Sequence, residues 1–435
     1  MTTYSYPTKT NSEFQAIVLP GDLGNQLFPL TEEDNVPIGL LPVANKPILH
    51  YVLGWLEKAG IRDVIIVAQT QTHQKIQHYL TRIYNGGINP ELEVVEDRDL
   101  DTADMLRHVR HRIHNDFLVI SCDLITDLPP HEFLDFYRLH DPTVAALFFE
   151  PPTTESPTPG KEKKRSDAMQ FVGLSPENSQ LVHLASSADI RDKFSLRTSL
   201  LWKFPRVQIF TTLEDAHVYI FKRWVLDFLA SRKGISSVKD ELIPILVKSQ
   251  YRPKFAEREG LMKFAGSYEP VSRVALEYSS VSAPEVGPIN CLAYVQRTGF
   301  CGRATSIQDY ADLNRNLTKT TTLPRVPESA EAQAKAVGAD SLVGEDTKIE
   351  ERTSIKRSTV GSHCIIGKGV KISNSVVMDH VVIEDNVKLE GCIVCHNAKI
   401  LERAQLKDCE VGGGYIVKAE TLAKNEKLVG QVLFG

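Results

Sequence analysis

Residues 14–26 read Phe-Gln-Ala-Ile-Val-Leu-Pro-Gly-Asp-Leu-Gly-Asn-Gln, an apolar strand that runs into a turn with two glycines. Gly21 and Gly24 let backbone N–H groups approach a ligand closely, so a strand, a glycine turn and a following helix are typical of a phosphate cradle. Two glycines alone are a weak signal. Residues 40–47 then read Leu-Leu-Pro-Val-Ala-Asn-Lys-Pro at the head of a predicted helix, where the first turn tolerates proline.

Taken together, the two stretches resemble the sugar nucleotidyltransferases. That family carries Gly-Gly-x-Gly-Thr-Arg in the turn and Pro-Lys-x-Leu-x-Pro-Val-x-x-Lys-Pro after it, and its Arg and first Lys hold the triphosphate. Here Asp22 matches the second glycine, Gln26 the Arg and Ile38 the first Lys. One preorganised donor is worth about 3 to 4 kcal/mol of barrier, and a carboxylate repels phosphate. We therefore expect the nucleotidyltransferase fold without the chemistry.

The chain continues with apolar runs interleaved with helical patterns, which is typical of a sheet covered by helices on both faces. Residues 151–168 are rich in Pro, Thr and Lys, which predicts a mobile insertion. Residues 251–287 show no clear period, and residues 318–337 predict a linker. The expected strands are 63–68, 92–96, 117–122, 144–149, 208–212, 217–221 and 289–296, and the expected helices are 48–59, 71–83, 102–114, 223–230, 238–248 and 306–317.

Asp123 follows the expected strand 117–122, at the end of the strand where ligands bind in such sheets. In the nucleotidyltransferases an Asp at this place binds the metal that bridges the phosphates, and Asp123 matches it. An aspartate that caps a turn is an equally good interpretation. The segment 101–103 matches a family Gly-Thr-Ala segment that approaches the base, with Asp101 in place of Gly.

We therefore predict a remnant nucleotide pocket at Gly21, Gly24 and Asp123, with no catalytic residue, no cofactor and no metal. Asp215 and Asp240 are possible second metal ligands by their position, but single acids beside helices are usually solvated.

The composition is that of an ordinary protein of two domains: 435 residues, 42% hydrophobic and 24% charged. A net charge of -5 and the lack of a clustered basic face argue against nucleic acid as the main partner. The sequence has no run of 18 apolar residues, and its first 13 residues have no apolar core. We therefore expect no membrane span and no signal peptide, and we expect a cytosolic location. Seven cysteines in no regular spacing indicate reduced, packed thiols.

A repeat of 17 residues fills the C-terminal part of the chain. Each repeat divides into three segments with one aliphatic residue each, which predicts a triangular coil, the signature of a parallel β-helix. The aliphatic positions are Val343, Val360, Val377, Val394 and Val411; Ile349, Ile366, Ile383 and Ile400; and Ile355, Ile372, Leu389 and Leu406.

Two sets of residues in the repeat allow a second interpretation. Cys392 occupies a position that holds serine in earlier coils, so its proximity to Cys395 indicates packing rather than half of a zinc site. His363 and His380 raise the possibility of an acyltransferase. However, they occupy the same position of the repeat as Asp346 and Asn397, which favours a polar corner.

Four apolar residues do not fit the interior positions of the coil: Val376, Met378, Val381 and Ile393. We expect them to form an outward apolar strip that binds a partner subunit, as at obligate interfaces.

The whole chain resembles the gamma-subunit family of eukaryotic translation initiation factor 2B. The resemblance implies an α/β fold: a nucleotidyltransferase-like (Rossmann-like) mixed sheet domain over residues 1–317, a linker, and a left-handed parallel β-helix over residues 338–435. It rests on residues 40–47, Ser121-Cys122-Asp123-Leu124-Ile125-Thr126-Asp127, Asp215-Ala216-His217-Val218-Tyr219, Glu241-Leu242-Ile243-Pro244 and Ser354-Ile355-Lys356-Arg357-Ser358.

The resemblance implies a non-catalytic subunit that pairs with epsilon, joins the alpha, beta and delta subunits, and helps bind initiation factor 2 during GDP release. It implies no direct contact with nucleic acid or membrane. Because Gly435 follows the fifth rung, we expect the chain not to carry the helical exchange domain of epsilon. The alternatives are an active nucleotidyltransferase of the mannose-1-phosphate guanylyltransferase type and a nucleotide-sensing module.

Overall fold

A computed structural model describes residues 13–21, 27–31, 36–96, 100–151, 170–176, 179–187, 196–265, 288–320, 324–327, 329–330, 336–338 and 340–430. These residues fall into two compact units. The described residues of the first lie within Met1–Leu19, Leu53–His73 and Leu80–Gly302, and those of the second within Pro20–Val52, Gln74–Tyr79 and Arg303–Gly435. The predicted boundaries at residues 317 and 338 stay a prediction, and the insertion predicted at 151–168 lies almost wholly outside the described residues. No described helix has the length and apolarity to cross a bilayer.

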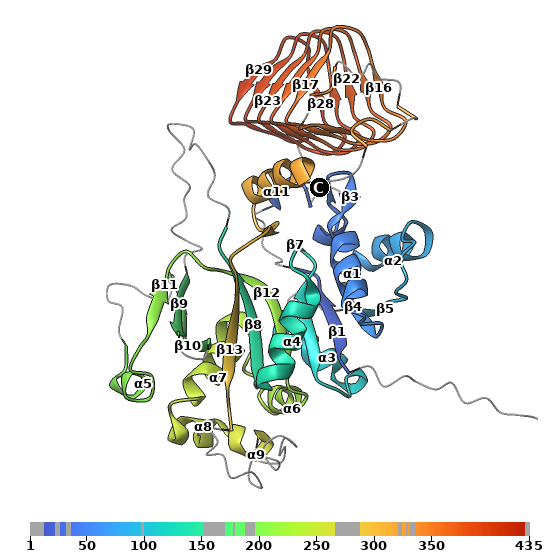
Figure 1. Ribbon diagram of the computed structural model, residues 1–435. Helices are drawn as coiled ribbons and strands as arrows, with labels where there is room; N and C mark the ends of the chain where they lie inside the picture. Colours follow the sequence, from blue (N-terminus) through green and yellow to red (C-terminus); the bar gives the residue numbers. More distant parts are fainter. Residues whose placement is uncertain are drawn as a thin grey trace, which may run out of the picture. The chain divides into compact units, whose positions relative to one another are not determined.

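The first unit is built on a mixed sheet, as predicted (Figure 1). Neighbouring strands are parallel on one side of the sheet, from β6 to β5, and mostly antiparallel on the other. Among the described residues the strand order is β11 (Gln208–Phe210), β9 (Gln170–Ser175), β10 (Gln180–Ser186), β13 (Cys291–Gln296), β8 (Val144–Phe149), β12 (Glu214–Phe221), β6 (Phe117–Ser121), β1 (Gln15–Leu19), β4 (Val64–Gln69) and β5 (Glu91–Val95).

Both faces of this sheet are buried, which is why its central strands read as unbroken apolar runs. Ile17 and Val119 pack on one face with residues of the helices α3, α6 and α7. Val18 and Ile120 point to the other face and are equally buried. The helices are α1 (Ile48–Lys58), α2 (His73–Arg82), α3 (Thr102–Val109), α4 (Pro130–His140), α5 (Thr198–Lys203), α6 (Trp224–Ser231), α7 (Ile243–Ser249), α8 (Pro253–Glu259) and α9 (Leu261–Ala265).

Several details differ from the sequence patterns, among them helix α4, which was not expected. The helix expected over 102–114 ends at Val109 and continues as a 3-10 turn over Arg110–Arg112. The helix expected from Val238 starts as a π-helical turn, Val238–Leu242, because Pro244 lacks an N–H to donate and fits only the first turn of α7. Residues 253–265 form α8 and α9, whose pattern is hidden because Gly260, with φ of 75°, separates them.

The second unit contains the β-helix, whose coils form three parallel sheets in which each strand pairs with the one 17 residues later. We name each sheet's outer surface by its first strand. The β15 face has β15 (Leu342–Val343), β18 (Thr359–Val360), β21 (Val376–Val377), β24 (Ile393–Val394), β27 (Glu410–Val411) and β30 (Lys427–Leu428); the β16 face has β16 (Lys348–Ile349), β19 (Ile365–Ile366), β22 (Val382–Ile383), β25 (Lys399–Ile400) and β28 (Ile416–Val417); the β17 face has β17 (Ser354–Lys356), β20 (Lys371–Ser373), β23 (Lys388–Glu390), β26 (Gln405–Lys407) and β29 (Leu422–Lys424).

The interior of the coil confirms the predicted repeat. All thirteen predicted aliphatic positions lie in one buried core, and the serine position forms a ladder. Ser358 Oγ accepts a hydrogen bond from the Ser375 N–H at 3.1 Å, and Ser375 Oγ accepts one from the Cys392 N–H at 3.1 Å. Burial raises the pKa of the Cys392 thiol to about 12, as expected for a packed thiol.

The polar corner is explained by its backbone. Asp346, His363, His380 and Asn397 all have φ between 52° and 59°, a left-handed conformation that Asn and Asp tolerate better than most residues. The rings of His363 and His380 stack at 5.0 Å between centroids, as neighbours in a ladder do. These histidines therefore hold a corner of the coil.

The predicted outward apolar strip is wrong. Val376, Met378, Val381 and Ile393 are at most 5% exposed, and Val381 belongs to the interior core of the coil. Val376 and Ile393 lie in strands of the β15 face, and Met378 directly follows β21. The chain's own helix α11 (Ile307–Thr320) lies against β18 of this face.

Tyr310 of α11 marks where the helix crosses the β15 face. It is fully buried, and of its electrostatic neighbours Asp379 follows β21 by two residues and Cys395 follows β24 directly. Burial raises the pKa of its hydroxyl well above the usual value. An apolar strip covered by the chain itself is not available to a partner.

Candidate functional site

The candidate site begins where strands β1 and β6 end side by side. Leu19 is in register with Ser121, and the Cys122 N–H donates to the Leu19 carbonyl at 2.9 Å. Gly21 follows β1 by two residues with φ of 85°, a conformation that side-chain-bearing residues rarely adopt. Asp123 follows β6 by two residues and is fully buried.

Three residues of the predicted glycine turn, Asp22, Gly24 and Gln26, lie outside the described residues. Ser121 was not singled out in the sequence; its hydroxyl is buried without a hydrogen-bond partner among the described residues. No pattern signals such a group, because a serine at a strand end is common.

The predicted metal ligands do not form a cluster. In the part of the chain that the structure describes, no group of three or more His, Cys, Asp or Glu residues is placed to hold a metal ion. Asp215 Oδ1 accepts from the His217 N–H at 2.8 Å, and its Oδ2 accepts from the Tyr219 hydroxyl at 2.6 Å. Asp240 lies in the first turn of the π-helical segment, where its N–H donates to Ser237 Oγ at 3.2 Å. Asp215 thus lies at an irregularity of strand β12, and Asp240 lies in the π-helical turn.

Ile38 occupies the place of the family's first phosphate-binding lysine. It lies in a 3-10 turn, Ile38–Leu40, and is buried. An alkyl side chain in such a place packs and donates no hydrogen bond, and a lysine there would bury an ammonium group. The structure therefore uses this position for packing.

The signature segment at residues 42–47 forms a hairpin inside the second unit. Strands β2 (Pro42–Val43) and β3 (Lys46–Pro47) pair across Ala44 and Asn45, whose φ values are 48° and 62°. Two positive φ values in a two-residue loop are typical of a type I′ turn. Lys46, which keeps the family's second lysine, is half-buried in β3.

Hydrogen bonds tie this hairpin to α11 and to the β-helix. The Tyr310 hydroxyl donates to the Pro42 carbonyl, and Asn314 Oδ1 accepts from the Ala44 N–H at 3.0 Å. Asn45 Nδ2 donates to the Val360 carbonyl of the β15 face at 3.0 Å. Tyr310 and Asn314 lie four residues apart on one face of α11. The sequence could show that spacing, but not the partner 268 residues away.

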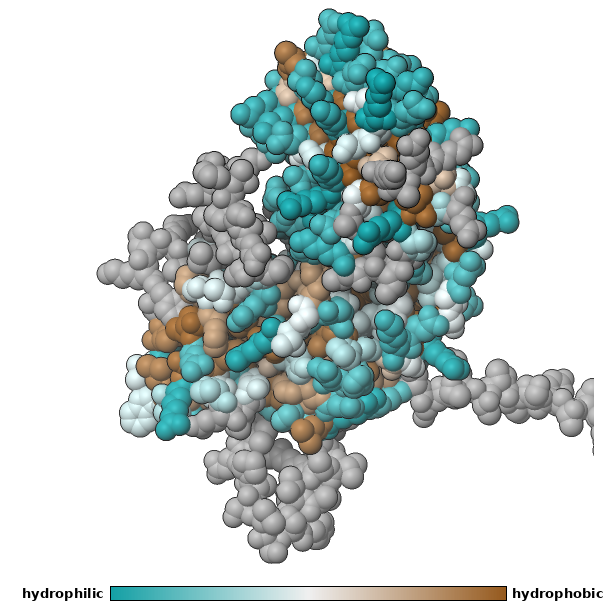
Figure 2. Space-filling view, turned by 45° about the horizontal axis from the view of Figure 1, so that its top comes forward, coloured by the Kyte–Doolittle hydropathy of each residue, from teal (hydrophilic) through white to brown (hydrophobic). Residues whose placement is uncertain are grey.

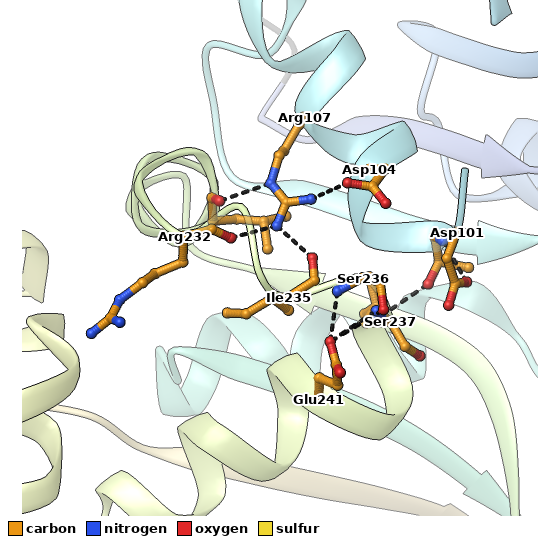
Figure 3. A network of polar contacts seen from close by, with 11 residues as sticks. Asp101, Asp104, Arg107, Arg232, Ile235, Ser236, Ser237 and Glu241 are labelled. Carbon is orange, nitrogen blue, oxygen red and sulfur yellow. Dashed lines mark hydrogen bonds and ion pairs between the residues drawn. The ribbon is translucent and has the colours of Figure 1, made fainter. Parts of the chain in front are cut away.

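The segment that matches the family's base-facing residues is now the start of a helix (Figure 3). Asp101 is the N-cap of α3, because its Oδ1 accepts from the Thr102 N–H at 2.6 Å. Thr102 Oγ1 accepts from the Val238 N–H at 2.9 Å, and Glu241 Oε2 accepts from the Ser236 N–H at 2.6 Å. A cap of this kind stabilises a helix by about 1 kcal/mol. Asp101 in place of glycine therefore has a structural reason.

Arg107 fixes the same region from the side of α3, as Figure 3 shows. Its Nε donates to the Leu229 carbonyl at 2.9 Å, and one terminal nitrogen donates to the carbonyls of Arg232 and Ile235. Its other terminal nitrogen pairs with Asp104. The guanidinium therefore binds the end of α6 and the segment after it, and it is not directed at a phosphate. Nothing in the sequence marked Arg107.

Two family models match the chain. The model described as "Nucleotidyl transferase" matches residues 15–171, and the one described as "EIF2B subunit epsilon LbH domain" matches residues 327–422. The predicted order of the two folds, a nucleotidyltransferase-like sheet followed by a left-handed β-helix, is thereby confirmed.

Curated relatives cover almost the whole chain. "Translation initiation factor eIF2B subunit gamma" of Schizosaccharomyces pombe is 40% identical over 420 residues, which is 96% of this chain and 90% of the relative. The protein of the same name from Dictyostelium discoideum is 29% identical over 395 residues, 82% of this chain and 89% of its own. "Mannose-1-phosphate guanyltransferase" of Gibberella zeae is 25% identical over 246 residues, 55% of this chain and 58% of its own.

Proposed function

Because this chain belongs to the gamma-subunit family of translation initiation factor eIF2B, we propose that it is a non-catalytic subunit of the exchange factor for initiation factor 2. In this proposal it acts in the cytosol, pairs with the epsilon subunit, joins the alpha, beta and delta subunits, and helps bind initiation factor 2 so that GDP is released. The observation that carries the proposal is 40% identity to a gamma subunit over 96% of the chain.

The non-catalytic part of the proposal is supported by what the signature residues do. Nucleotidyl transfer depends on positioning and on charges aimed at the phosphates. Ile38 packs in a buried turn, and the 42–47 hairpin is bonded to α11 and the β-helix. Asp101 caps a helix. These residues support a structural use of the old nucleotide segment.

The second candidate is an active nucleotidyltransferase of the mannose-1-phosphate guanylyltransferase type. The match of residues 15–171 to the nucleotidyl transferase model favours it, as does the 25% identity to the Gibberella zeae enzyme. Gly21 and Asp123 keep their places after β1 and β6, which both candidates share.

Copurification separates the two candidates. We expect that the tagged full chain, purified from eukaryotic cells and analysed by mass spectrometry, brings down the other four eIF2B subunits in similar amounts, together with initiation factor 2. Recovery of the chain alone, or with enzymes of sugar metabolism, would refute the subunit proposal.

A turnover assay tests the non-catalytic part independently. With GTP and mannose 1-phosphate the purified chain is expected to release no pyrophosphate above a protein-free blank. The triple variant Asp22→Gly, Gln26→Arg, Ile38→Lys should bind GTP more tightly, because two cations return and one carboxylate leaves. Since Ile38 is buried, a melting curve must accompany the assay. Pyrophosphate release by the natural chain would sink the non-catalytic part and leave subunit membership standing.

A further inference from the structure

The β17 face carries a concentration of positive charge, so the expectation that the chain lacks a clustered basic face is wrong. In each of its strands the middle residue points into the core, and the two flanking residues point outward. Five of the outward side chains are lysines and one is acidic. The exposed ones are Lys356, Lys371, Lys388, Glu390, Gln405, Lys407, Leu422 and Lys424.

Two pairs of these lysines are direct neighbours in the sheet. Lys371 is in register with Lys388, and Lys407 with Lys424, at the usual strand spacing of about 4.8 Å. Like charges directly opposite each other destabilise a sheet, and opposite charges stabilise it. Only between Glu390 and Lys407 does this face use the stabilising arrangement, with 3.0 Å between Lys407 Nζ and Glu390 Oε1.

The corners beside the β17 face carry charges of both signs. Arg352 and Arg357 flank β17 and are exposed, whereas exposed acidic residues at equivalent corners include Glu351, Glu402 and Glu420. The chain as a whole has a net charge of -5. A basic face on an acidic chain is therefore a local feature and does not follow from the composition. Hydrophilic side chains cover much of the β-helix surface in the view of Figure 2.

We propose that the β17 face binds an acidic, extended segment of a partner protein. The lysine rows lie on a flat, exposed sheet, so carboxylates of such a segment can approach several ammonium groups at once. Opposite charge on the partner relieves the repulsion between Lys371 and Lys388. This proposal goes beyond the subunit assignment, because the residues that carry it are independent of the nucleotide segment.

A protein segment fits this face better than RNA does. Single-stranded RNA is held by aromatic side chains that stack on its bases. Tyr415 is the one Phe, Tyr or Trp residue of the described β-helix, 340–430, and it precedes β28 on another face. Leu422, 75% exposed, instead continues the row of Lys371 and Lys388, and it offers an apolar contact to a peptide.

Binding of a polyglutamate probe tests the proposal. The full chain is titrated into a fluorescein-labelled peptide of about 12 glutamates at about 50 mM salt, where surface charges are weakly screened, and anisotropy is read. We expect binding that weakens as salt rises. Lys371→Glu with Lys388→Glu should weaken it about tenfold or more, whereas Lys371→Arg with Lys388→Arg should bind like the natural chain.

The matched control makes the same charge change elsewhere. Lys233→Glu with Lys254→Glu alters two exposed lysines of the first unit and should leave the affinity within about twofold. Equal losses in both double variants, or no binding by the natural chain, overturn the proposal. Tighter binding of a 12-nucleotide RNA, single- or double-stranded, than of the peptide overturns it in favour of nucleic acid. Circular dichroism checks that the coil stays folded; should the glutamate variant melt early, Lys371→Gln with Lys388→Gln replaces it.

Discussion

Two faces of the β-helix share one repeat and differ in what lies on them. On the β15 face, the outward side chains Val376 and Ile393 are at most 5% exposed, and α11 lies against β18 of the same face. On the β17 face, the outward side chains Lys371 and Lys388 are exposed. The interior residues of both faces are equally buried. The repeat therefore determines the inside of the coil, whereas segments far away in the sequence determine which outer face is covered.

The largest expected effect comes from the inside, which the two faces share. Val394→Asp places a carboxylate in the core of the coil, where Val394 is fully buried, and should lower the free energy of unfolding by more than about 4 kcal/mol. Chemical denaturation followed by circular dichroism measures it. Gln405→Asp, on the exposed β17 face, is the control and should change the value by less than about 0.5 kcal/mol. Equal losses would mean that the outer face is packed too.

The next effect concerns the cover of the β15 face. Tyr310 is fully buried and its hydroxyl donates to the Pro42 carbonyl. Tyr310→Ala should cost about 3 to 5 kcal/mol, because a large cavity opens under α11. Tyr310→Phe removes only the hydrogen bond and should cost about 1 kcal/mol. Thermal and chemical unfolding of both variants measure these losses of stability. If Tyr310→Ala loses no more stability than Tyr310→Phe, the packing of α11 does not depend on this residue.

A smaller effect separates two isoleucines in equivalent outward positions. Ile393 on the β15 face is 5% exposed, and Ile365 on the β16 face is 49% exposed. Ile393→Ala should cost about 2 to 4 kcal/mol, and Ile365→Ala less than about 1 kcal/mol. Denaturation midpoints measured side by side test this. A similar cost at both sites would show that burial of the β15 face contributes little.

The smallest effect is a gain in stability. Lys388→Gln removes the repulsion from Lys371 and should raise the free energy of unfolding by about 0.2 to 0.5 kcal/mol at low salt. The gain should shrink as salt screens the pair. Glu390→Gln is the converse test, since it removes the partner of Lys407 and should lower stability slightly. A gain that does not change with salt would rule out repulsion as its cause.

Much of this fold could be predicted from the sequence. The interior of the β-helix could be predicted because Val343 and its equivalents recur every 17 residues. The central strands of the first unit were readable because burial on both faces makes them uniformly apolar. Where local chemistry interrupts a pattern, prediction failed: Gly260 hid α8 and α9, and Pro244 turned the start of a helix into a π-helical turn.

The candidate site was less predictable, because its residues have partners far away in the sequence. Gly21 was predicted for its backbone freedom and has the positive φ expected of that role. The role of the 42–47 hairpin depends on Tyr310 and Asn314, and no local pattern links these segments. Met378 and Ile393 were likewise predicted as exposed, because the sequence of α11 does not show where that helix packs.

The bond between Asn45 and the Val360 carbonyl has a consequence for the newly made chain. Its two residues are 315 positions apart, and ribosomes add about 5 to 20 residues per second. The hairpin therefore leaves the ribosome about 15 to 60 s before the coil that it is bonded to. During this interval no tertiary bond to the coil can form, so the second unit reaches its final state only after most of the chain has been synthesised.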